Sequence, residues 1–166
     1  MPATFSSRRA TPEDAEAIAR IYNEGIADRV ATFETRLRSA EDVRAWFDSV
    51  HPVVVVECAG EILAFAATSA YRPRECYAGI AEVSLYVARS ARRRGIGGVA
   101  MRALIEAAES AGFWKLVSRV FVENLASRSL IRKFGFREVG VYEKHAQLDG
   151  VWRDVVIVER IIPANL

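Results

Sequence analysis

The sequence predicts a mixed α/β domain, and three observations support this fold class. Segments with apolar residues at helical spacing alternate with short β-branched runs, so helices and strands are interspersed along the chain. A predicted helix lies on each side of strand 116–122, as crossover connections require, and the last two predicted strands form an antiparallel pair. With 166 residues and neither repeat nor linker, we expect a single domain over 1–166 with one mixed, mostly antiparallel sheet and flanking helices.

The first half of the chain is predicted to contain two helices and a hairpin. Thr11 is a suitable cap for the first helix, and Pro12 suits its first turn. Ser39 caps the second helix, which carries apolar side chains as far as Val50. Turn residues at 59–61 separate two β-branched runs and predict the hairpin. The predicted elements are a helix with its apolar face over 15–26, an irregular segment 30–35, a helix over 40–50, and strands 53–56 and 62–67.

The second half alternates strands and helices and ends in a second hairpin. Gly112 ends the longer helix and Gly135 the shorter one, because glycine readily adopts the left-handed conformation after a helix. Asp149 and Gly150 predict the turn of the last hairpin. The predicted elements are strand 81–87, helix 96–111, strand 116–122, helix 127–134, and strands 136–144 and 152–161.

Composition excludes several classes of function. A net charge of +2 is too small to indicate nucleic-acid binding. No segment approaches the ~20 apolar residues of a membrane span, and residues 1–9 lack an apolar signal region, so we expect a cytoplasmic protein that does not bind membranes. The chain has two cysteines, Cys58 and Cys76, and two histidines, His51 and His145, and they are widely separated in the sequence. We therefore expect free thiols, histidines at the surface or a strand edge, and no metal site.

The segment 92–98, Arg-Arg-Arg-Gly-Ile-Gly-Gly, follows a predicted strand and opens a predicted helix. Glycines let the backbone approach a ligand, the first N–H groups of a helix lack internal partners, and the helix dipole favours anions. The segment therefore predicts a pyrophosphate cradle. Its spacing fits neither the Walker A loop nor the dinucleotide-binding fingerprint, which disfavours nucleoside triphosphates and NAD. The alternative is a basic turn at an ordinary helix start.

The loop resembles the acetyl-CoA loop of the GNAT superfamily of N-acetyltransferases, with Arg92, Gly95 and Gly97 at its pattern positions. A second match is Asn124, Ser127 and Leu130, followed by Gly-Phe at 135–136. The resemblance implies the GNAT fold, in which two central strands splay apart, and acetyl-CoA as co-substrate. It also implies that Asn124 binds the pantetheine arm, although Asn124 and Ser127 also suit a helix cap. The cofactor-binding residues implied are Leu85, Tyr86, Val87, Arg92, Arg93, Arg94, Gly95, Ile96, Gly97, Gly98, Asn124 and Ser127.

Further segments resemble the phosphinothricin N-acetyltransferase group and cover nearly the whole chain. They are 21–23, 32–35, 81–87 and 150–154. The resemblance implies acetylation of the α-amine of a glutamate-like antimetabolite amino acid, such as phosphinothricin or methionine sulfoximine, and hence detoxification and herbicide resistance. The tail 143–160 looks closest to the branch that acetylates arsinothricin. A homodimer is also implied; the apolar stretch 155–162 fits either an interface or the core.

Glu82 is the candidate general base. An α-ammonium must lose a proton before it attacks a thioester, and Glu82 is a charged residue within an apolar strand, at the family's base position. The alternative is an ordinary solvent-facing residue. Strand alternation puts Ser84 on the same face, and the family leaves backbone groups of 85–87 free to hold pantetheine and polarise the thioester. Transfer would then be direct, without a covalent enzyme intermediate.

We expect the substrate to be bound by the arginines of a basic loop, together with other residues of the same pocket. Arg72 and Arg74 supply forked donors for an amino acid with a second acidic group, or else belong to a solvated loop. Phe33 and Thr35 are further lining candidates, although an aromatic is often only core. The substrate-binding set is therefore Arg72, Arg74, Glu82, Ser84, Phe33 and Thr35.

One position departs from the family, since Ile131 stands where a Tyr or His is usual and cannot protonate the leaving thiolate. Tyr142, Tyr77 or a water would replace it, or the thiolate leaves unassisted. Two other functions remain possible. They are acetylation of a peptide N-terminus or an ordinary amino acid, and a non-catalytic acetyl-CoA sensor, which the retention of Glu82 disfavours.

Overall fold

A computed structural model describes residues 3–166 and contains one seven-stranded sheet in the order β1-β2-β3-β4-β5-β7-β6. Neighbouring strands are antiparallel except β4 and β5, which are parallel, so the predicted mixed, mostly antiparallel sheet is confirmed. The strands are β1 (Ser6–Arg9), β2 (Val53–Cys58), β3 (Glu61–Ala70), β4 (Ile80–Val87), β5 (Lys115–Phe121), β6 (Arg137–Leu148) and β7 (Val151–Ile161). The α-helices are α1 (Ala15–Asp28), α2 (Ala40–Arg44), α3 (Ile96–Ser110) and α4 (Leu125–Lys133), with short 3₁₀ segments at 12–14, 45–48, 75–77, 89–91 and 163–165.

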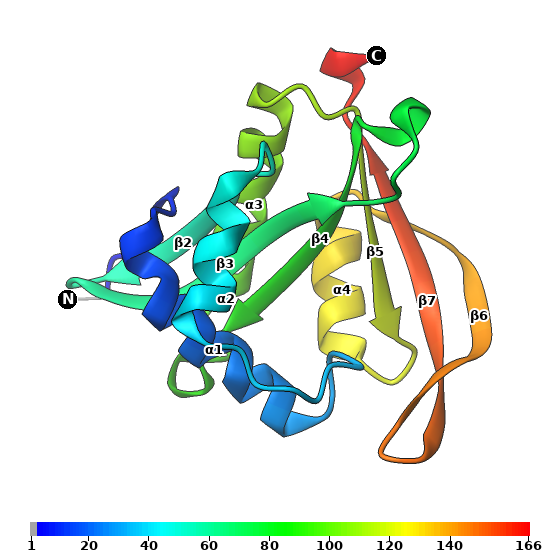
Figure 1. The fold of residues 1–166 in the computed structure, drawn as a ribbon, viewed down its shortest axis with the longest axis horizontal. Helices are drawn as coiled ribbons and strands as arrows, with labels where there is room; N and C mark the ends of the chain where they lie inside the picture. The colour runs from blue at the N-terminus through cyan, green and yellow to red at the C-terminus, as the bar shows by residue number, and fades with distance from the viewer. Residues whose placement is uncertain (1–2) are drawn as a thin grey trace.

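Helices cover both faces of the sheet. Figure 1 shows α1 and α2 in front of the half formed by β2 to β4, and α3 and α4 behind the sheet. Ile18 and Ile21 of α1, Phe65 of β3 and Leu104 of α3 are all completely buried. They meet in one core because each helix turns its apolar stripe toward the sheet.

The first strand was not predicted from the sequence. β1 consists of Ser6, Ser7, Arg8 and Arg9, all exposed, and so shows no apolar alternation. It is an edge strand held by backbone pairing with β2, from Ser6 opposite Glu57 to Arg9 opposite Val54. Pairing of this kind depends on a partner distant in sequence, which local propensity does not reveal.

The second helix is shorter than predicted. α2 ends at Arg44 and continues only as a 3₁₀ segment to Asp48, while Val50 is 79% exposed. Ser49 takes an extended backbone, and its hydroxyl accepts from the His51 N–H at 3.2 Å. His51 also precedes Pro52, a position that disfavours helix. The prediction of helix through Val50 was therefore wrong: the α-helix ends six residues earlier, and the 3₁₀ segment ends two residues before Val50.

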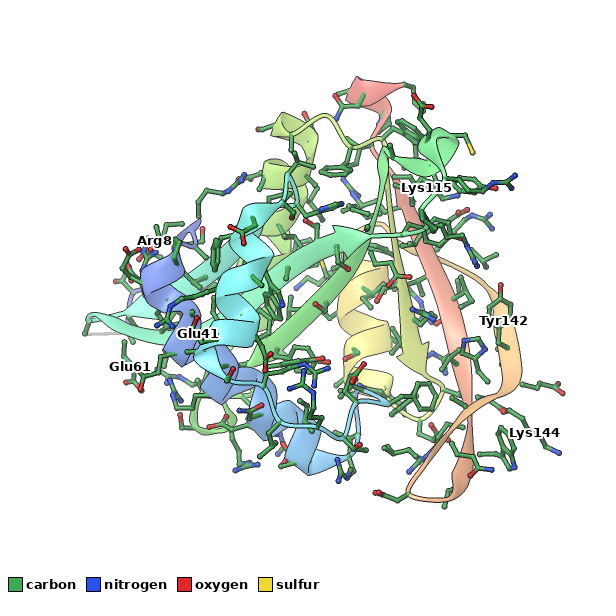
Figure 2. The ribbon with its side chains drawn as sticks, viewed as in Figure 1. Arg8, Glu41, Glu61, Lys115, Tyr142 and Lys144 are labelled. Atoms are coloured by element: carbon green, nitrogen blue, oxygen red, sulfur yellow. The ribbon has the colours of Figure 1, made fainter. Side chains whose placement is uncertain are left out.

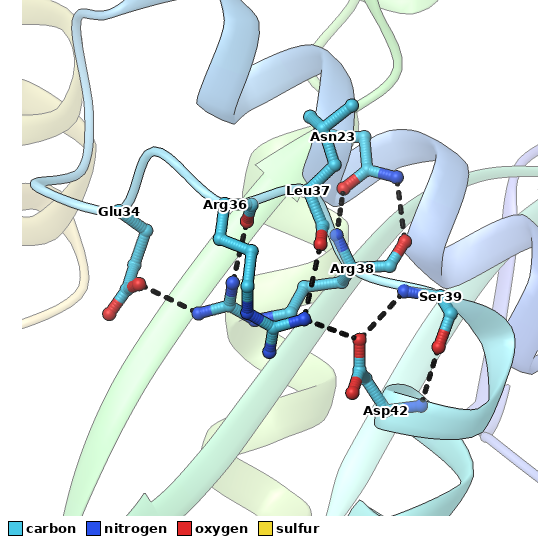
Figure 3. A network of polar contacts seen from close by, with 7 residues as sticks. All are labelled: Asn23, Glu34, Arg36, Leu37, Arg38, Ser39 and Asp42. Atoms are coloured by element: carbon cyan, nitrogen blue, oxygen red, sulfur yellow. Dashed lines mark hydrogen bonds and ion pairs between the residues drawn. The ribbon is translucent and has the colours of Figure 1, made fainter.

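The loop between α1 and α2 is held by a polar network (Figure 3). The Asn23 carboxamide donates to the Arg38 carbonyl and accepts from the Arg38 N–H, both at 2.8 Å. Arg38 also pairs with Glu34 at 2.7 Å, and Ser39 and Asp42 cap α2 reciprocally. This network fixes the irregular segment that runs from α1 across the open end of the sheet (Figure 1).

The two central strands splay apart, as the family resemblance implies. β4 and β5 pair only from Ile80 opposite Lys115 to Glu82 opposite Val117. Beyond this point each strand keeps its outer partner, β3 or β7, and the two ribbons diverge (Figure 1). The Ser118 hydroxyl donates to the Val83 carbonyl at 2.9 Å where the divergence begins. Within residues 3–166, the backbone edge of β4 that faces β5 thus lacks a strand partner after Glu82.

The last two strands form a long hairpin with a predominantly exposed outer strand. β6 extends to Leu148, four residues beyond its predicted end, and its pairing register shifts between Tyr142 and Ala146. The irregularity explains the early predicted end, since Lys144 has a positive φ of 45°. On β7, Val155, Val156 and Val158 are at most 1% exposed. The apolar stretch that fitted either core or interface therefore contributes mainly to the core.

Candidate active site

Two cavities meet where β4 and β5 diverge. The first, here called the crevice, has a volume of about 90 Å³, and the second, here called the pocket, about 260 Å³. Both are lined by Ser118 and Arg119, so they are adjacent. The crevice is lined by Ala31, Val83, Ser84, Leu85, Tyr86, Met101, Ser118, Arg119, Val120, Asn124, Ser127, Leu130 and Ile131. The pocket is lined by Tyr71, Arg72, Glu82, Lys115, Val117, Ser118, Arg119, Val139, Tyr142, His145, Ile157 and Glu159.

Four of the predicted cofactor-binding residues line the crevice: Leu85, Tyr86, Asn124 and Ser127. Asn124 is the N-cap of α4, and its side-chain oxygen accepts from the Ser127 N–H at 3.2 Å. Its amide nitrogen lies 3.4 Å from the Val30 carbonyl, which connects α4 to the α1–α2 loop. Asn124 therefore caps the helix and still borders the space between the splayed strands.

Tyr86 faces the crevice mainly through its backbone. Its ring stacks on Phe65 at 5.5 Å and meets the Tyr22 ring edge-on at 4.9 Å between centroids. Burial raises the pKa of the Tyr86 hydroxyl, so this phenol stays neutral at ordinary pH. A Cβ on Gly25 of α1 would lie 2.5 Å from the same ring, so this close packing requires glycine there. Val87, by contrast, lies toward α3 and does not line the crevice.

The glycine loop continues from the end of β4 into α3 and lies outside the crevice. Gly95 is the N-cap of α3 with φ 77°, and Arg93 also has a positive φ of 64°. A Cβ on Gly97 would lie 3.2 Å from Leu130, so glycine allows α3 to pack closely against α4. A Cβ on Gly98 would lie 3.5 Å from the Phe134 ring, an ordinary van der Waals contact. Ile96 is 1% exposed, which leaves only its backbone for a ligand.

The three arginines of the loop are exposed but differ in their contacts. Arg92 pairs with Asp28 at 2.7 Å, and the Arg94 guanidinium lies 5.0 Å from the Phe5 ring centroid. Within residues 3–166, Arg93 forms no ion pair. Of the three guanidinium groups, only that of Arg92 is paired with a carboxylate within residues 3–166.

Glu82 is the last residue of β4 that pairs with β5, and it lines the pocket. Its side chain is 29% exposed, and Arg119 of β5 donates from one nitrogen to both carboxylate oxygens at 3.1 and 3.2 Å. Ser84 lies two residues further along β4 and lines the crevice rather than the pocket. The carboxylate therefore stands beside the junction of the two cavities.

The other predicted substrate-binding residues separate into two groups. Arg72 lines the pocket, with its guanidinium 5.0 Å from the Tyr71 ring centroid. Arg74 is exposed, caps a 3₁₀ segment and does not line the pocket. Phe33 packs against Phe121 at 4.8 Å in a small apolar cluster, and Thr35 is exposed in the α1–α2 loop; neither lines the crevice or the pocket.

Several pocket residues were not singled out from the sequence. Arg119 and its neighbour Ser118 are polar within an apolar strand, the same signal that identified Glu82. Lys115 pairs with Glu159 at 2.5 Å, and a hydrogen bond from Lys115, followed by one from Arg137, lowers the pKa of Glu159. These pairings depend on strand neighbours that only the three-dimensional structure reveals.

Candidate proton donors to a leaving thiolate differ in position. Tyr142, from β6, lines the pocket, and Figure 2 labels it together with Lys115 of β5. His145, which we expected at the surface or a strand edge, is exposed on β6 and also lines the pocket, 5.0 Å from the Tyr142 ring. Tyr77 packs against Tyr71 and does not line the pocket. Ile131 is 8% exposed and gives the crevice an apolar wall.

Within 3–166, no three His, Cys, Asp or Glu side chains are grouped as metal ligands. No helix in the same range is long and apolar enough to cross a membrane.

Comparison with known proteins identifies the family of the chain. The model of the acetyltransferase (GNAT) family matches residues 18–136. The chain is 32% identical to the phosphinothricin N-acetyltransferase of Streptomyces coelicolor, covering 96% of this chain and 99% of that one. It is 31% identical to the L-methionine sulfoximine/L-methionine sulfone acetyltransferase of Pseudomonas aeruginosa PAO1, covering 93% and 92% of the two chains.

Two solved structures are similar over nearly the whole chain. A phosphinothricin acetyltransferase from Sinorhizobium meliloti in complex with acetyl-CoA has a TM-score of 0.88 and 28% identity, covering 98% of this chain and 89% of that one. A ribosomal-protein-alanine N-acetyltransferase from Brucella melitensis has a TM-score of 0.90 and 31% identity, covering 95% and 99%. The predicted fold, enzyme class and use of acetyl-CoA are confirmed by these findings. With a family model that matches well over half of its length and relatives above 30% identity over nearly all of it, the protein belongs to the GNAT family of acetyltransferases.

Proposed function

We propose that this acetyltransferase transfers the acetyl group of acetyl-CoA to the α-amine of a glutamate-like antimetabolite amino acid. The candidate substrates are phosphinothricin, methionine sulfoximine and arsinothricin. One observation carries the proposal: Glu82 stands where the crevice meets a pocket rimmed by arginine. The similarity to enzymes named for phosphinothricin and methionine sulfoximine supports the same substrate class.

The crevice suits the pantetheine arm of acetyl-CoA. It is narrow, one wall is the unpaired edge of β4, and the other carries Asn124 and Ser127. An extended amide chain can pair with free backbone groups of 83–87 as an added strand would. The pyrophosphate then reaches the N-terminus of α3 and the arginines of residues 92–94.

The pocket suits an amino acid with a second acidic group. A volume of about 260 Å³ admits a small molecule rather than a folded chain. Arg72 at its rim can bind an anionic side chain, while the α-ammonium is directed to Glu82. Arg72 therefore favours side chains that end in an anion, as in phosphinothricin and arsinothricin, or in polar sulfoximine oxygen and nitrogen atoms, as in methionine sulfoximine, over apolar side chains.

The reaction follows from this placement. The Glu82 carboxylate accepts a proton from the α-ammonium, directly or through one water, and the neutral nitrogen attacks the thioester carbonyl carbon. Formation of the C–N bond turns the carbonyl oxygen into an oxyanion; its collapse breaks the C–S bond, and CoA departs as a thiolate. Tyr142 or a water gives a proton to the sulfur and takes up the second proton that the nitrogen releases as it becomes an amide. Backbone N–H groups on the free edge of β4 can stabilise the oxyanion, a contribution typically worth ~10²–10³ in rate.

A substrate panel tests the proposal. Free CoA release is measured with acetyl-CoA and, separately, phosphinothricin, methionine sulfoximine, arsinothricin, glutamate, an apolar amino acid and a peptide beginning with alanine. Turnover confined to the glutamate analogues supports the proposal. Turnover of the peptide alone would replace it with N-terminal acetylation, which similarity to the ribosomal-protein-alanine enzyme favours as a second candidate.

Assembly and location form a separate part of the proposal. β6 is an edge strand with exposed apolar side chains, including Val139, Val141 and Tyr142, and these support a homodimer. Sedimentation equilibrium distinguishes a dimer from the 18.4 kDa monomer. Use of acetyl-CoA supports a cytoplasmic location.

A further inference from the structure

We propose that Arg119 binds the α-carboxylate of the amino acid and, until it does so, restrains Glu82. This inference rests on the proposed function and deepens it, because it names a residue that selects α-amino acids over simple amines. It also revises the pair of anion-binding arginines. Arg72 and Arg74 are close in sequence, but the residues that share the pocket are Arg72 and Arg119.

Arg119 occupies a distinctive position. Val117 is paired with Glu82, and Arg119 follows two residues later on the same face of β5, just beyond the last paired position. Its side chain reaches back across the vertex of the splay to Glu82 and lines both crevice and pocket. Any amine that reaches Glu82 from the pocket must therefore pass beside this guanidinium.

Some N–H donors of the Arg119 guanidinium are unused. Its hydrogen bonds to the Glu82 oxygens both come from Nη2, and within residues 3–166 neither Nε nor Nη1 has a hydrogen-bond partner. The side chain is 51% exposed, so these donors face the cavities rather than the core. A guanidinium presents five N–H donors in a fork that matches a carboxylate.

The present pairing leaves the Glu82 carboxylate engaged. Both of its oxygens accept from Arg119 Nη2, so an incoming ammonium must share them with the guanidinium. An incoming α-carboxylate offers Arg119 an alternative partner, and the adjacent α-ammonium offers one to Glu82. One exchange of partners thus seats the substrate and frees the base, while a simple amine lacks the group that draws Arg119 away.

The closeness of Arg119 to Glu82 determines which anionic group of the substrate Arg119 binds. In an α-amino acid the carboxylate is attached to the carbon that bears the amine. The arginine already within 3.2 Å of the base is therefore placed for the α-carboxylate. Arg72, at the rim, remains for the side-chain anion. The two arginines have separate tasks: Arg119 variants are expected to affect every α-amino acid, and Arg72 variants only those with an anionic side chain.

The test compares Arg119→Gln with wild type on methionine sulfone and on its decarboxylated amine, 3-(methylsulfonyl)propylamine. Loss of a charged hydrogen bond is expected to raise KM for the amino acid by ~10- to 100-fold. Turnover of the simple amine is expected to stay the same or increase, because Glu82 is no longer restrained. Arg132→Gln, on the exposed face of α4, is the matched control and should change neither substrate.

A structural role for Arg119 would lower both activities together, and either that result or no change in either substrate would overturn the inference. Thermal unfolding of each variant checks that the fold is kept. Wild type without turnover of any amino acid would instead overturn the proposed function, and this inference with it.

Discussion

Asp28, the last residue of α1, forms an ion pair with Arg92 of the glycine loop, and the closest atoms are 2.7 Å apart. The same carboxylate pairs with Arg89 at 2.7 Å, and Glu24, one turn earlier, accepts from the Arg89 N–H at 2.6 Å. Hydrogen bonds from Arg89 and then Arg92 lower the pKa of Asp28. The loop proposed to bind pyrophosphate is therefore held against α1 by ion pairs and a hydrogen bond without a ligand.

These contacts between α1 and the glycine loop predict an effect of Asp28 on acetyl-CoA binding. Asp28→Ala should raise KM for acetyl-CoA about fivefold with little change in kcat, as loss of ~1 kcal/mol of preorganisation would produce. Initial rates over a range of acetyl-CoA concentrations measure this. Asp48→Ala removes an exposed aspartate elsewhere and serves as control. A lower KM in Asp28→Ala would show that Asp28 competes with the phosphates for Arg92.

Two glycines allow backbone strain to be separated from ligand binding. Gly95 and Gly60 have φ of 77° and 82°, and an added Cβ would meet nothing within 4 Å at either. Gly95→Ala and Gly60→Ala should therefore destabilise the fold similarly, by ~1–2 kcal/mol. Only Gly95→Ala should raise KM for acetyl-CoA, because Gly60 lies in the β2–β3 turn. Equal KM values for the two variants would argue against a pyrophosphate site at the start of α3.

The basic loop provides a test of substrate recognition. Arg72→Ala should raise KM for phosphinothricin by ~10-fold or more, since a charged contact to the side-chain anion is lost. Arg74→Ala should have little effect, because Arg74 lies outside the pocket. Methionine sulfone, which lacks a side-chain anion, should be almost insensitive to both changes. Equal effects of the two variants on phosphinothricin would restore the pair proposed from the sequence alone.

Asp14 predicts a pH dependence of stability. Arg8 donates to both of its carboxylate oxygens at 2.8 and 2.9 Å, and this contact, with the Thr11 N–H, lowers the pKa of Asp14. A pKa lowered in the folded state stabilises that state at pH values above the pKa of an aspartate in the unfolded chain, which is about 3.9. This stabilisation is lost as the pH falls through the pKa of Asp14 in the folded state.

Asp14→Asn should therefore lower the free energy of unfolding by ~1–3 kcal/mol at pH 7, with a difference from wild type that shrinks below about pH 4. Urea unfolding at several pH values measures it, and Asp48→Asn is the control. A difference that stays constant with pH would exclude ionised Asp14 as its source.

The sequence predicted those parts of the molecule that depend on neighbours along the chain. The spacing of Ile18, Ile21 and Ile26 identified α1, and Gly112 correctly marked the end of α3. Motifs around Gly95 and Asn124 were sufficient to identify the family, because each occupies a local strand–loop–helix unit. β1 was missed because its polar residues are ordered only through pairing with a distant strand.

The candidate site was predicted less completely than the fold. Glu82 was noticed as a charge in an apolar strand, but Arg119 carries the same signal and becomes informative only when β4 and β5 are aligned. Proximity in sequence suggested that Arg72 and Arg74 act together, whereas the loop geometry brings only Arg72 to the pocket. Contacts between strands depend on register, which residue patterns leave open.

The most direct test of the central claim is the steady-state rate of CoA release with acetyl-CoA and phosphinothricin or methionine sulfoximine, in wild type and Glu82→Gln. The substitution keeps the shape of the side chain and removes the proton acceptor. We expect kcat to fall by ~10²–10⁴, with KM for acetyl-CoA nearly unchanged and Glu61→Gln, at the start of β3, behaving as wild type. An equal kcat in wild type and Glu82→Gln would contradict the assignment of Glu82 as the base, and absence of CoA release in wild type would contradict the proposed substrates.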